Sequence, residues 1–462
     1  MPGWFWLLIY AVIFGAFCLY AYLSTKNAKK AEKTTLLMRL WGMDSVKSIA
    51  SSIISIILGL IIGCIFLIVM SIIPTKGNTV SITTMYDGVQ LIFGGIFNIG
   101  RNNSGELLFG FSAVKIGDML FRATPIILTG LSVAIAFKTG LFNIGTPGQY
   151  LMGAAATLIL ALVIPTEVVP SFFVWCIAFI GGILAGALWG AIPGLFKAFL
   201  NVNEVITCIM TNWIAANIVT MLFDKTTGPF KFLLDPSGTK NLAFVFKTTE
   251  NGVATSKMGL DLLFPGSQVN GGIIIAIVIA IIMYIVINKT IFGYQLKACG
   301  HNKNSAKYAG INDKLAIIIS MAIAGGLAAA GASLYFLSGN TEFAWETYQS
   351  LPAAGFNGIP VALLAVNNPI GVVFSASFIS LLDVNGMQLK YMTPYNEYIT
   401  NIITAIIVYF SAFGLLFKQM LEGKIKIHFK NIFKRTNART VDEFSKPKEE
   451  LVIEAKEEEG DK

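Results

Sequence analysis

The sequence predicts an all-α polytopic membrane protein, a chain that crosses a membrane many times as helices. Of its 462 residues, 55% are hydrophobic and only 13% are charged, whereas a soluble domain carries about a quarter charged residues. The mean hydropathy is +0.69. Apolar runs of about twenty residues, the length that spans a bilayer as a helix, recur along the chain between shorter polar stretches.

The chain begins with an apolar run, residues 4–23, which we expect to form a membrane anchor because no small-residue cleavage site follows it. Residues 24–48 are basic and therefore belong in the cytoplasm, which places the N-terminus outside and, by alternation, the C-terminus inside. Residues 1–48 form the first domain. The tail, residues 419–462, is basic and then acidic, and we expect a separate cytoplasmic segment.

Residues 49–418 form the expected membrane domain, with about ten core spans. The expected spans are 50–73, 119–137, 148–164, 171–196, 203–223, 271–288, 314–337 and 398–418, with a pair of short or half helices at 355–366 and 369–382. An amphipathic piece, residues 86–97, is expected on the outer surface. Small residues within 171–196 favour close helix packing. Residues 224–270 form an extracellular loop that is too polar to build its own core, and residues 289–313 form a basic cytoplasmic loop.

The membrane pattern is interrupted at residues 138–156, KTGLFNIGTPGQYLMGAAA. Three residues there are expected to break a helix: Gly145, Pro147 and Gly148. Irregular backbone at membrane depth is tolerated only where it is buried in protein or lines a water-filled path. Three uncharged polar residues could therefore either bind a neutral solute or satisfy the broken backbone: Asn143, Thr146 and Gln149. Both interpretations remain open at this stage.

A second break, GFNGIP at residues 355–360, is a weak echo of GLFNIG. Paired breaks in the two halves of a transporter tend to mark the route of the solute. Phe142 and Phe356 could stack on a flat ring, although such residues more often serve packing. Asn357 completes the set of candidate path residues.

The basic loop contains a short amphipathic helix near residues 303–309. Its expected boundary residues are Gly300 in the turn before it, Asn302 or Asn304 as its N-cap, and Gly310 at its end. Ala306 and Ala309 form the small-residue face beside lysines. Such a helix could insert into a groove on a partner protein or lie on lipid.

Soluble-enzyme chemistry is absent from the sequence. It contains no phosphate-binding GxxxxGK[ST] loop, no HExxH and no GxSxG motif. The five cysteines are scattered without metal-ligand spacing, so no metal site is expected. The acids Glu204 and Asp383 are expected near helix ends rather than in mid-span, where an ion-coupled carrier would place them. The energy for transport is therefore expected from a partner chain.

Four blocks resemble ABC-transporter permeases for nucleosides and simple sugars, within the branched-chain amino acid and ribose permease group. The blocks are RATPIILTGLSVAIAFKTGLFNIGTPGQYLMGAA, NVNEVITCIMTNWIA, FGYQLKACGHNKNSAKYAGI and GFNGIPVALLAVNNPIG. They follow one another in the order found in the family and together cover roughly residues 50–418. The combination of GLFNIG-x-x-GQ with NEVIT is similar to the nucleoside branch.

The resemblance implies a type II importer fold and a dimer of permeases, usually a heterodimer of related subunits. It also implies two ATP-binding subunits, which would hold ATP and Mg, and an extracellular lipid-anchored binding protein. This chain would bind no cofactor. The resemblance assigns coupling to the ATPase to Gly300, Asn302, Ala306, Ala309, Gly310 and Ile311. Residues 1–48, the 224–270 loop, the charged tail and His301 depart from the family pattern.

The expected function is that of a permease subunit, not itself an enzyme, in an ABC importer for nucleosides or a related simple sugar. The expected solute path contains Phe142, Asn143, Thr146, Gln149, Phe356 and Asn357. Two alternatives remain. One is an ion-coupled secondary carrier that works without an ATPase. The other is a membrane scaffold without transport activity.

Overall fold

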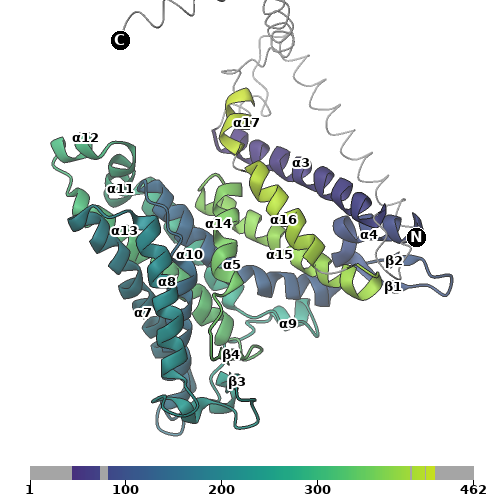
Figure 1. The fold of residues 1–462 in the computed structure, drawn as a ribbon, viewed down its shortest axis with the longest axis horizontal. Coiled ribbons are helices and arrows are strands. Elements are labelled where there is room, and N and C mark those ends of the chain that lie inside the picture. The colour runs from purple at the N-terminus through teal and green to yellow at the C-terminus, as the bar shows by residue number, and fades with distance from the viewer. Residues whose placement is uncertain (1–43, 73–81, 396–397, 412, 422–462) are drawn as a thin grey trace, which may run out of the picture. The chain divides into compact units, whose positions relative to one another are not determined.

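The computed structural model describes residues 44–72, 82–395, 398–411 and 413–421, and most of these residues are helical (Figure 1). The elements up to the middle of the chain are α3 (Asp44–Ile72), α4 (Ile82–Gly94), η1 (Gly95–Phe97), β1 (Asn98–Arg101), β2 (Leu107–Phe109), α5 (Ala113–Lys138), α6 (Thr146–Val163), α7 (Ser171–Leu200), α8 (Glu204–Leu222), η2 (Lys231–Leu233), β3 (Leu242–Val245), η3 (Thr248–Asn251) and α9 (Leu260–Leu263). The remaining elements are α10 (Gly272–Lys289), α11 (Ile291–His301), α12 (Lys303–Tyr308), α13 (Asp313–Phe336), β4 (Phe343–Glu346), α14 (Ala353–Leu364), α15 (Pro369–Met392), α16 (Tyr398–Ser411) and α17 (Gly414–Leu421).

Eight helices in the described part of the chain are long and apolar enough to cross a membrane. They are α3, α5, α6, α7, α8, α10, α13 and α15. Two shorter apolar helices, α14 and the first part of α16, bring the set to the expected number of about ten core spans. The expected anchor, residues 4–23, and nearly all of the charged tail lie outside the described residues.

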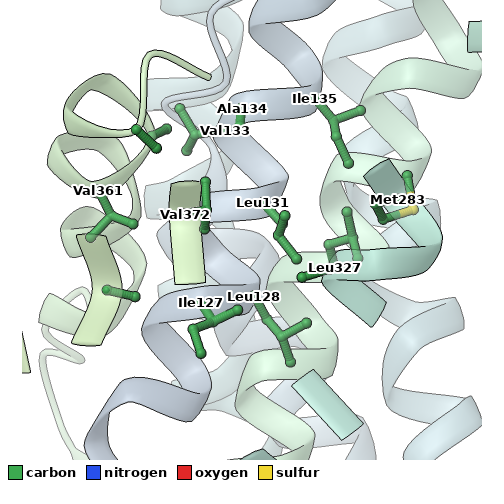
Figure 2. Close-up of a cluster of buried hydrophobic side chains, with 14 of the residues drawn as sticks. Ile127, Leu128, Leu131, Val133, Ala134, Ile135, Met283, Leu327, Val361 and Val372 are labelled. Atoms are coloured by element: carbon green, nitrogen blue, oxygen red, sulfur yellow. The ribbon is translucent and has the colours of Figure 1, made fainter. Parts of the chain in front are cut away.

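Helix α5 lies at the centre of the largest apolar cluster. Its side chains from Ala123 to Ala136 are all buried, and no charged residue interrupts them. Figure 2 shows Ile127, Leu128 and Leu131 of α5 between Val361 and Val372 on one side and Met283 and Leu327 on the other. Four helices, α10, α13, α14 and α15, therefore surround α5, which explains why it is apolar on every face.

Helix α7 packs against α13 through a row of glycines spaced four residues apart, from Gly182 to Gly194. A Cβ atom placed on Gly186 would lie 2.6 Å from the carbonyl oxygen of Gly325. One placed on Gly190 would lie 2.5 Å from the carbonyl oxygen of Met321. The backbones of the two helices are thus in direct contact, which confirms the expected role of the small residues in this span.

The second short helix of the expected pair is longer than predicted. Helix α14 has 12 residues, but α15 continues through polar residues to Met392 and has 24 residues. The helix continues because its polar side chains find partners. The amide nitrogen of Asn385 donates to the carbonyl oxygen of Ile92 at 2.7 Å, and the side chain of Gln388 accepts from Lys115 at 2.7 Å.

Residues 224–270 and 337–352 together form a small cap. Strands β3 and β4 pair antiparallel within it, and the side chains of Val245, Phe343 and Trp345 are buried against α6, α8 and α13. Hydrogen bonds from Thr226 and Thr227 hold the pKa of the Asp224 carboxyl below its usual range at the start of the cap. The cap thus has no hydrophobic core of its own, as predicted. Its buried side chains share the core of α6, α8 and α13.

The cap lies at one end of α7, α8 and α13, and α11 and α12 lie at the other (Figure 1). We call these the cap end and the α12 end. Helix α5 begins near the cap, because a Cβ atom on Gly117 would meet the side chains of Ser267 and Phe264. It ends at Lys138 beside Gly300 of α11.

Replacing Gly190 by valine is expected to destabilise the protein by about 1–3 kcal/mol, because the added side chain overpacks a backbone contact. Thermal unfolding of the purified protein in detergent measures the change. Leu188→Val, on the exposed side of the same helix, is the control and is expected to leave the unfolding temperature unchanged. An equal effect of both substitutions would contradict the close packing of α7 on α13.

Candidate functional site

The interruption between α5 and α6 occupies residues 139–145. Gly140 adopts a left-handed conformation with φ of +72°, and α6 begins at Thr146 with Pro147 in its first turn. The prediction that Pro147 and Gly148 break the helix is therefore wrong. Proline is tolerated in a first turn because its missing N–H would have no partner there in any case. The break precedes these residues.

Asn143 and Gln149 bind each other through both ends of their side-chain amides. The amide nitrogen of Asn143 donates to the oxygen of Gln149 at 2.8 Å, and the nitrogen of Gln149 donates back to the oxygen of Asn143 at 3.1 Å. The backbone N–H of Gly145 also donates to the Asn143 oxygen at 3.0 Å. The hydroxyl of Thr146 donates to the Asn143 carbonyl at 3.1 Å. All three candidate polar side chains are buried.

A further polar residue, Asn212 of α8, completes this network. Its side-chain oxygen accepts from the backbone N–H of Gly148 at 2.9 Å, and its nitrogen donates to the carbonyl of Ile144 at 3.0 Å. Sequence reasoning missed Asn212. The signal that could have found it is an amide residue inside an apolar helix, because such a residue needs hydrogen-bond partners when it is buried. The network satisfies the irregular backbone, as the structural interpretation requires. The proposed role of these residues along a solute path stays a prediction.

The second break lies directly against the first. A Cβ atom on Gly355 of α14 would lie 2.5 Å from the Cα atom of Pro147. The hydroxyl of Thr129 on α5 donates to the carbonyl of Ala354 at 3.0 Å, so the first turn of α14 contacts both α5 and α6. The structure thus brings together two segments more than two hundred residues apart in the chain.

The candidate aromatic residues differ in their surroundings. The ring of Phe142 is half-buried and lies 5.0 Å from the ring of Phe137. Phe356 is 38% exposed, and Asn357 is half-buried. Of the six candidate path residues, Phe356 is therefore the most accessible, while the polar cluster lies behind the first turn of α14.

The basic loop folds into α11 and α12. Asn302 is the N-cap of α12, because its side-chain oxygen accepts from the backbone N–H of Ser305 at 3.1 Å. Gly310, with φ of +78°, ends the segment as predicted. Gly300 lies within α11, so its placement in a turn was wrong. A helical glycine is required there because a Cβ atom would lie 2.5 Å from the carbonyl oxygen of Lys138 and 2.8 Å from the nitrogen of Gly140.

The six candidate coupling residues divide into two groups. Three face the protein: Gly300, the buried Ala306 and the half-buried Ile311. Three are exposed: Asn302, Ala309 and Gly310. Tyr308, which the sequence grouped with Ala306 and Ala309 on one side of this helix, is 94% exposed, whereas Ala306 is buried. Burial raises the pKa of the neighbouring Cys299 thiol, in agreement with its apolar surroundings.

Comparison with known proteins identifies relatives. The family described as "Branched-chain amino acid transport system / permease component" matches residues 115–412. The chain is 36% identical to the nucleoside ABC transporter permease protein NupB of Lactococcus lactis subsp. cremoris, over 67% of this chain and 82% of the relative. It is 32% identical to the guanosine ABC transporter permease protein NupP of Bacillus subtilis, over 73% and 88%. It is also 28% identical to the glucose ABC transporter permease protein TsgB13 of Haloferax volcanii, over 68% and 80%. No solved structure matches.

Replacing Asn143 by leucine is expected to destabilise the protein by about 1–3 kcal/mol for each buried polar group left without a partner. Gly145 and Gln149 both lose their partner in this variant. A denaturant titration in detergent measures the effect. The control is Asn217→Leu, the same change at an exposed position of α8, for which little effect is expected. A stable Asn143→Leu protein would refute the structural role of the network.

Proposed function

We infer the function of this chain from its family: it belongs to the permease components of the branched-chain amino acid transport system, and it is a multi-pass membrane protein. Its similarity to nucleoside, guanosine and glucose permeases supports an ABC importer for nucleosides or a related sugar. The observation that carries this proposal is the match over most of the chain to a nucleoside permease at 36% identity. We propose nucleosides as the first class of solute to test.

The distribution of basic residues supports an orientation. Lys138, Lys197 and Lys289 lie at helix ends on the α12 side, and the 290–312 connection carries further lysines. At the cap end, residues 164–170 and 337–352 contain neither Lys nor Arg, whereas the longer 224–270 segment carries five lysines. By the positive-inside rule the α12 end is cytoplasmic and the cap is extracellular. Alternation of the spans then leaves the N-terminus outside and the C-terminus in the cytoplasm.

The proposed energy source is a pair of ATP-binding subunits at the cytoplasmic side, which hold ATP and Mg. The exposed side of α12, including Tyr308 and Ala309, is the proposed contact with them. Its buried side holds Ala306 in the apolar cluster that also contains α5 residues. A second, homologous permease subunit and an extracellular binding lipoprotein complete the assembly.

The contact between Gly140 and Gly300 offers a direct route for motion from α12 into the membrane domain. Each glycine approaches the backbone of the other, since a Cβ atom on Gly140 would lie 3.0 Å from the Cα atom of Gly300. Gly140 opens the loop that contains Asn143, and Pro147 after that loop touches Gly355 of α14. Displacement of α11 would therefore act first on the α5–α6 loop and then on α14.

The proposed solute path runs past the first turn of α14. Phe356 and Asn357 face it most directly because they retain accessible surface. Phe142, Asn143, Thr146 and Gln149 lie behind this turn and would approach the path as α6 and α14 separate. Uncharged amides and hydroxyls at such a position suit a neutral, hydrogen-bonding solute.

The proposed function is tested in proteoliposomes that contain this permease, its second permease and the ATP-binding subunits, with the binding protein added outside. ATP-dependent uptake of labelled nucleoside is expected, with none when ATP is omitted. Uptake driven by an ion gradient in the absence of the ATPase would establish a secondary carrier instead. Complete absence of nucleoside and sugar uptake in a correctly assembled complex would favour a scaffold.

Gly300→Ala is expected to reduce solute-stimulated ATP hydrolysis at least tenfold while the ATP-binding subunits still co-purify. The added methyl group separates α11 from the 138–140 backbone but leaves the exposed face of α12 intact. His301→Ala, at the adjacent exposed position, is the control and should retain full stimulation. If solute still stimulates ATP hydrolysis normally in Gly300→Ala, the contact between Gly140 and Gly300 does not transmit motion.

A further inference from the structure

Helices α5 and α15 pack side by side and run in opposite directions, and two contacts define their register. A Cβ atom on Gly130 of α5 would lie 2.9 Å from the side chain of Val372 on α15. Nearer the cap end, the Lys115 ammonium donates to the side chain of Gln388 at 2.7 Å. Between these two contacts lie Arg122 of α5 and Asp383 of α15. Asp383 follows Val372, Ala376 and Ile379 along one stripe of α15, and these three side chains pack in the apolar cluster around α5. Burial is the strongest influence on the Asp383 carboxyl, and the positive charge of Arg122 is the second.

These two charged side chains are close but not bonded to each other. The ion pairs within 4.0 Å in the described residues are Asp87–Arg101, Lys197–Glu204 and Lys247–Glu342. Neither Arg122 nor Asp383 is among them or among the side-chain hydrogen bonds of that part of the chain. Both are half-buried, and none of their polar atoms is sealed from solvent without a partner. Each side chain therefore keeps some accessible surface.

Both side chains lie in helices that are long and apolar enough to cross a membrane. Arg122 is nine residues from the start of α5 and Asp383 is nine residues from the end of α15, which is about 13 Å along each helix. The expectation that Asp383 lies near a helix end is therefore wrong, because α15 continues to Met392. Charged side chains at such depth pair, bind a ligand or line a water-filled cavity. Glu204 has Lys197 as its partner, whereas Arg122 and Asp383 leave their hydrogen-bonding capacity open.

Arg122 and Asp383 lie on the cap side of the first turn of α14, past which the proposed path runs. Thr129 lies two turns from Arg122 on the same face of α5, and its hydroxyl contacts the first turn of α14. Helix α14 therefore contacts this face of α5 at Thr129. Toward the cap end lie Arg122 and Tyr335 of α13, whose hydroxyl is influenced first by burial and then by the Arg122 charge. The ring of Tyr335 stacks on Phe121 at 5.4 Å and forms an aromatic wall.

We propose that Arg122 and Asp383 form a solute-binding subsite that recognises the vicinal hydroxyl groups of a ribose or of a simple sugar. A carboxylate accepts hydrogen bonds from two neighbouring hydroxyls, and a guanidinium donates to hydroxyl or ring oxygens in a fixed plane. The two charges cancel, so the subsite suits a neutral solute. This inference rests on the proposed function. It adds the chemical group of the solute that the permease itself recognises.

The test uses the assembled transporter with its binding protein loaded to saturation by each ligand in turn. The ligands are a ribonucleoside, its 2′,3′-dideoxy analogue, ribose and 2-deoxyribose. The wild-type complex is expected to import the hydroxylated member of at least one pair at least tenfold faster than the deoxygenated member. Asp383→Asn is expected to abolish this preference by slowing only the hydroxylated solute, because an amide accepts these hydrogen bonds less well.

Asp118→Asn makes the same change on the same face of α5, and its retained oxygen can still accept from the backbone of Gln268, so the preference is expected to persist. Arg122→Lys provides a second variant that keeps the charge but loses the planar donor, and its preference is expected to fall as well. It decides the matter if Asp383→Asn does not assemble.

Loss of preference in the nucleoside pair identifies a nucleoside as the solute, and loss in the sugar pair alone identifies a sugar. A preference that survives Asp383→Asn, or equal slowing of both members of a pair, overturns the subsite. Absence of ATP-dependent uptake for every ligand in the wild type instead contradicts the proposed function itself.

Discussion

The membrane domain depends on satisfying the backbone where the chain leaves helical form between α5 and α6. Inside a membrane no water is available to compensate a free N–H or C=O group, so protein must supply the partners. Asn143 and Asn212 do so, since an amide side chain carries a donor and an acceptor on one planar group, and Gln149 holds the Asn143 amide in place. Their burial fixes the end of α5, the start of α6 and the middle of α8 relative to one another.

Glycines extend this fixed region to the neighbouring elements. Gly140 touches α11 and Gly355 touches Pro147, each through atoms of the backbone. Contacts of this kind contain no flexible side chain that could absorb a displacement, and packed interiors transmit strain for that reason. The α12 end and the first turn of α14 are thereby joined through one short loop, the route along which we propose that motion passes.

Features set by local sequence were predictable. The long apolar runs predicted the spans, and Asn302 and Gly310 predicted the limits of α12, because caps and left-handed glycines act within a few residues. The end of α15 was not predictable, because its polar residues are helical only by virtue of Ile92 and Lys115, distant in the chain. Gly300 was misplaced for the same reason: its role is to admit a backbone some 160 residues away, and no local pattern reveals that contact.

The sequence by itself determined the class of the protein, its approximate number of spans and its family resemblance, since hydropathy and motifs are properties of consecutive residues. Only the tertiary structure decided which polar groups meet. It paired Asn143 with Gln149, bonded Asn212 to the backbone of Ile144 and Gly148, turned Ala306 inward, and brought Arg122 near Asp383. Helical periodicity states which residues share a face, but the neighbour of that face depends on how close the backbones of different helices can approach.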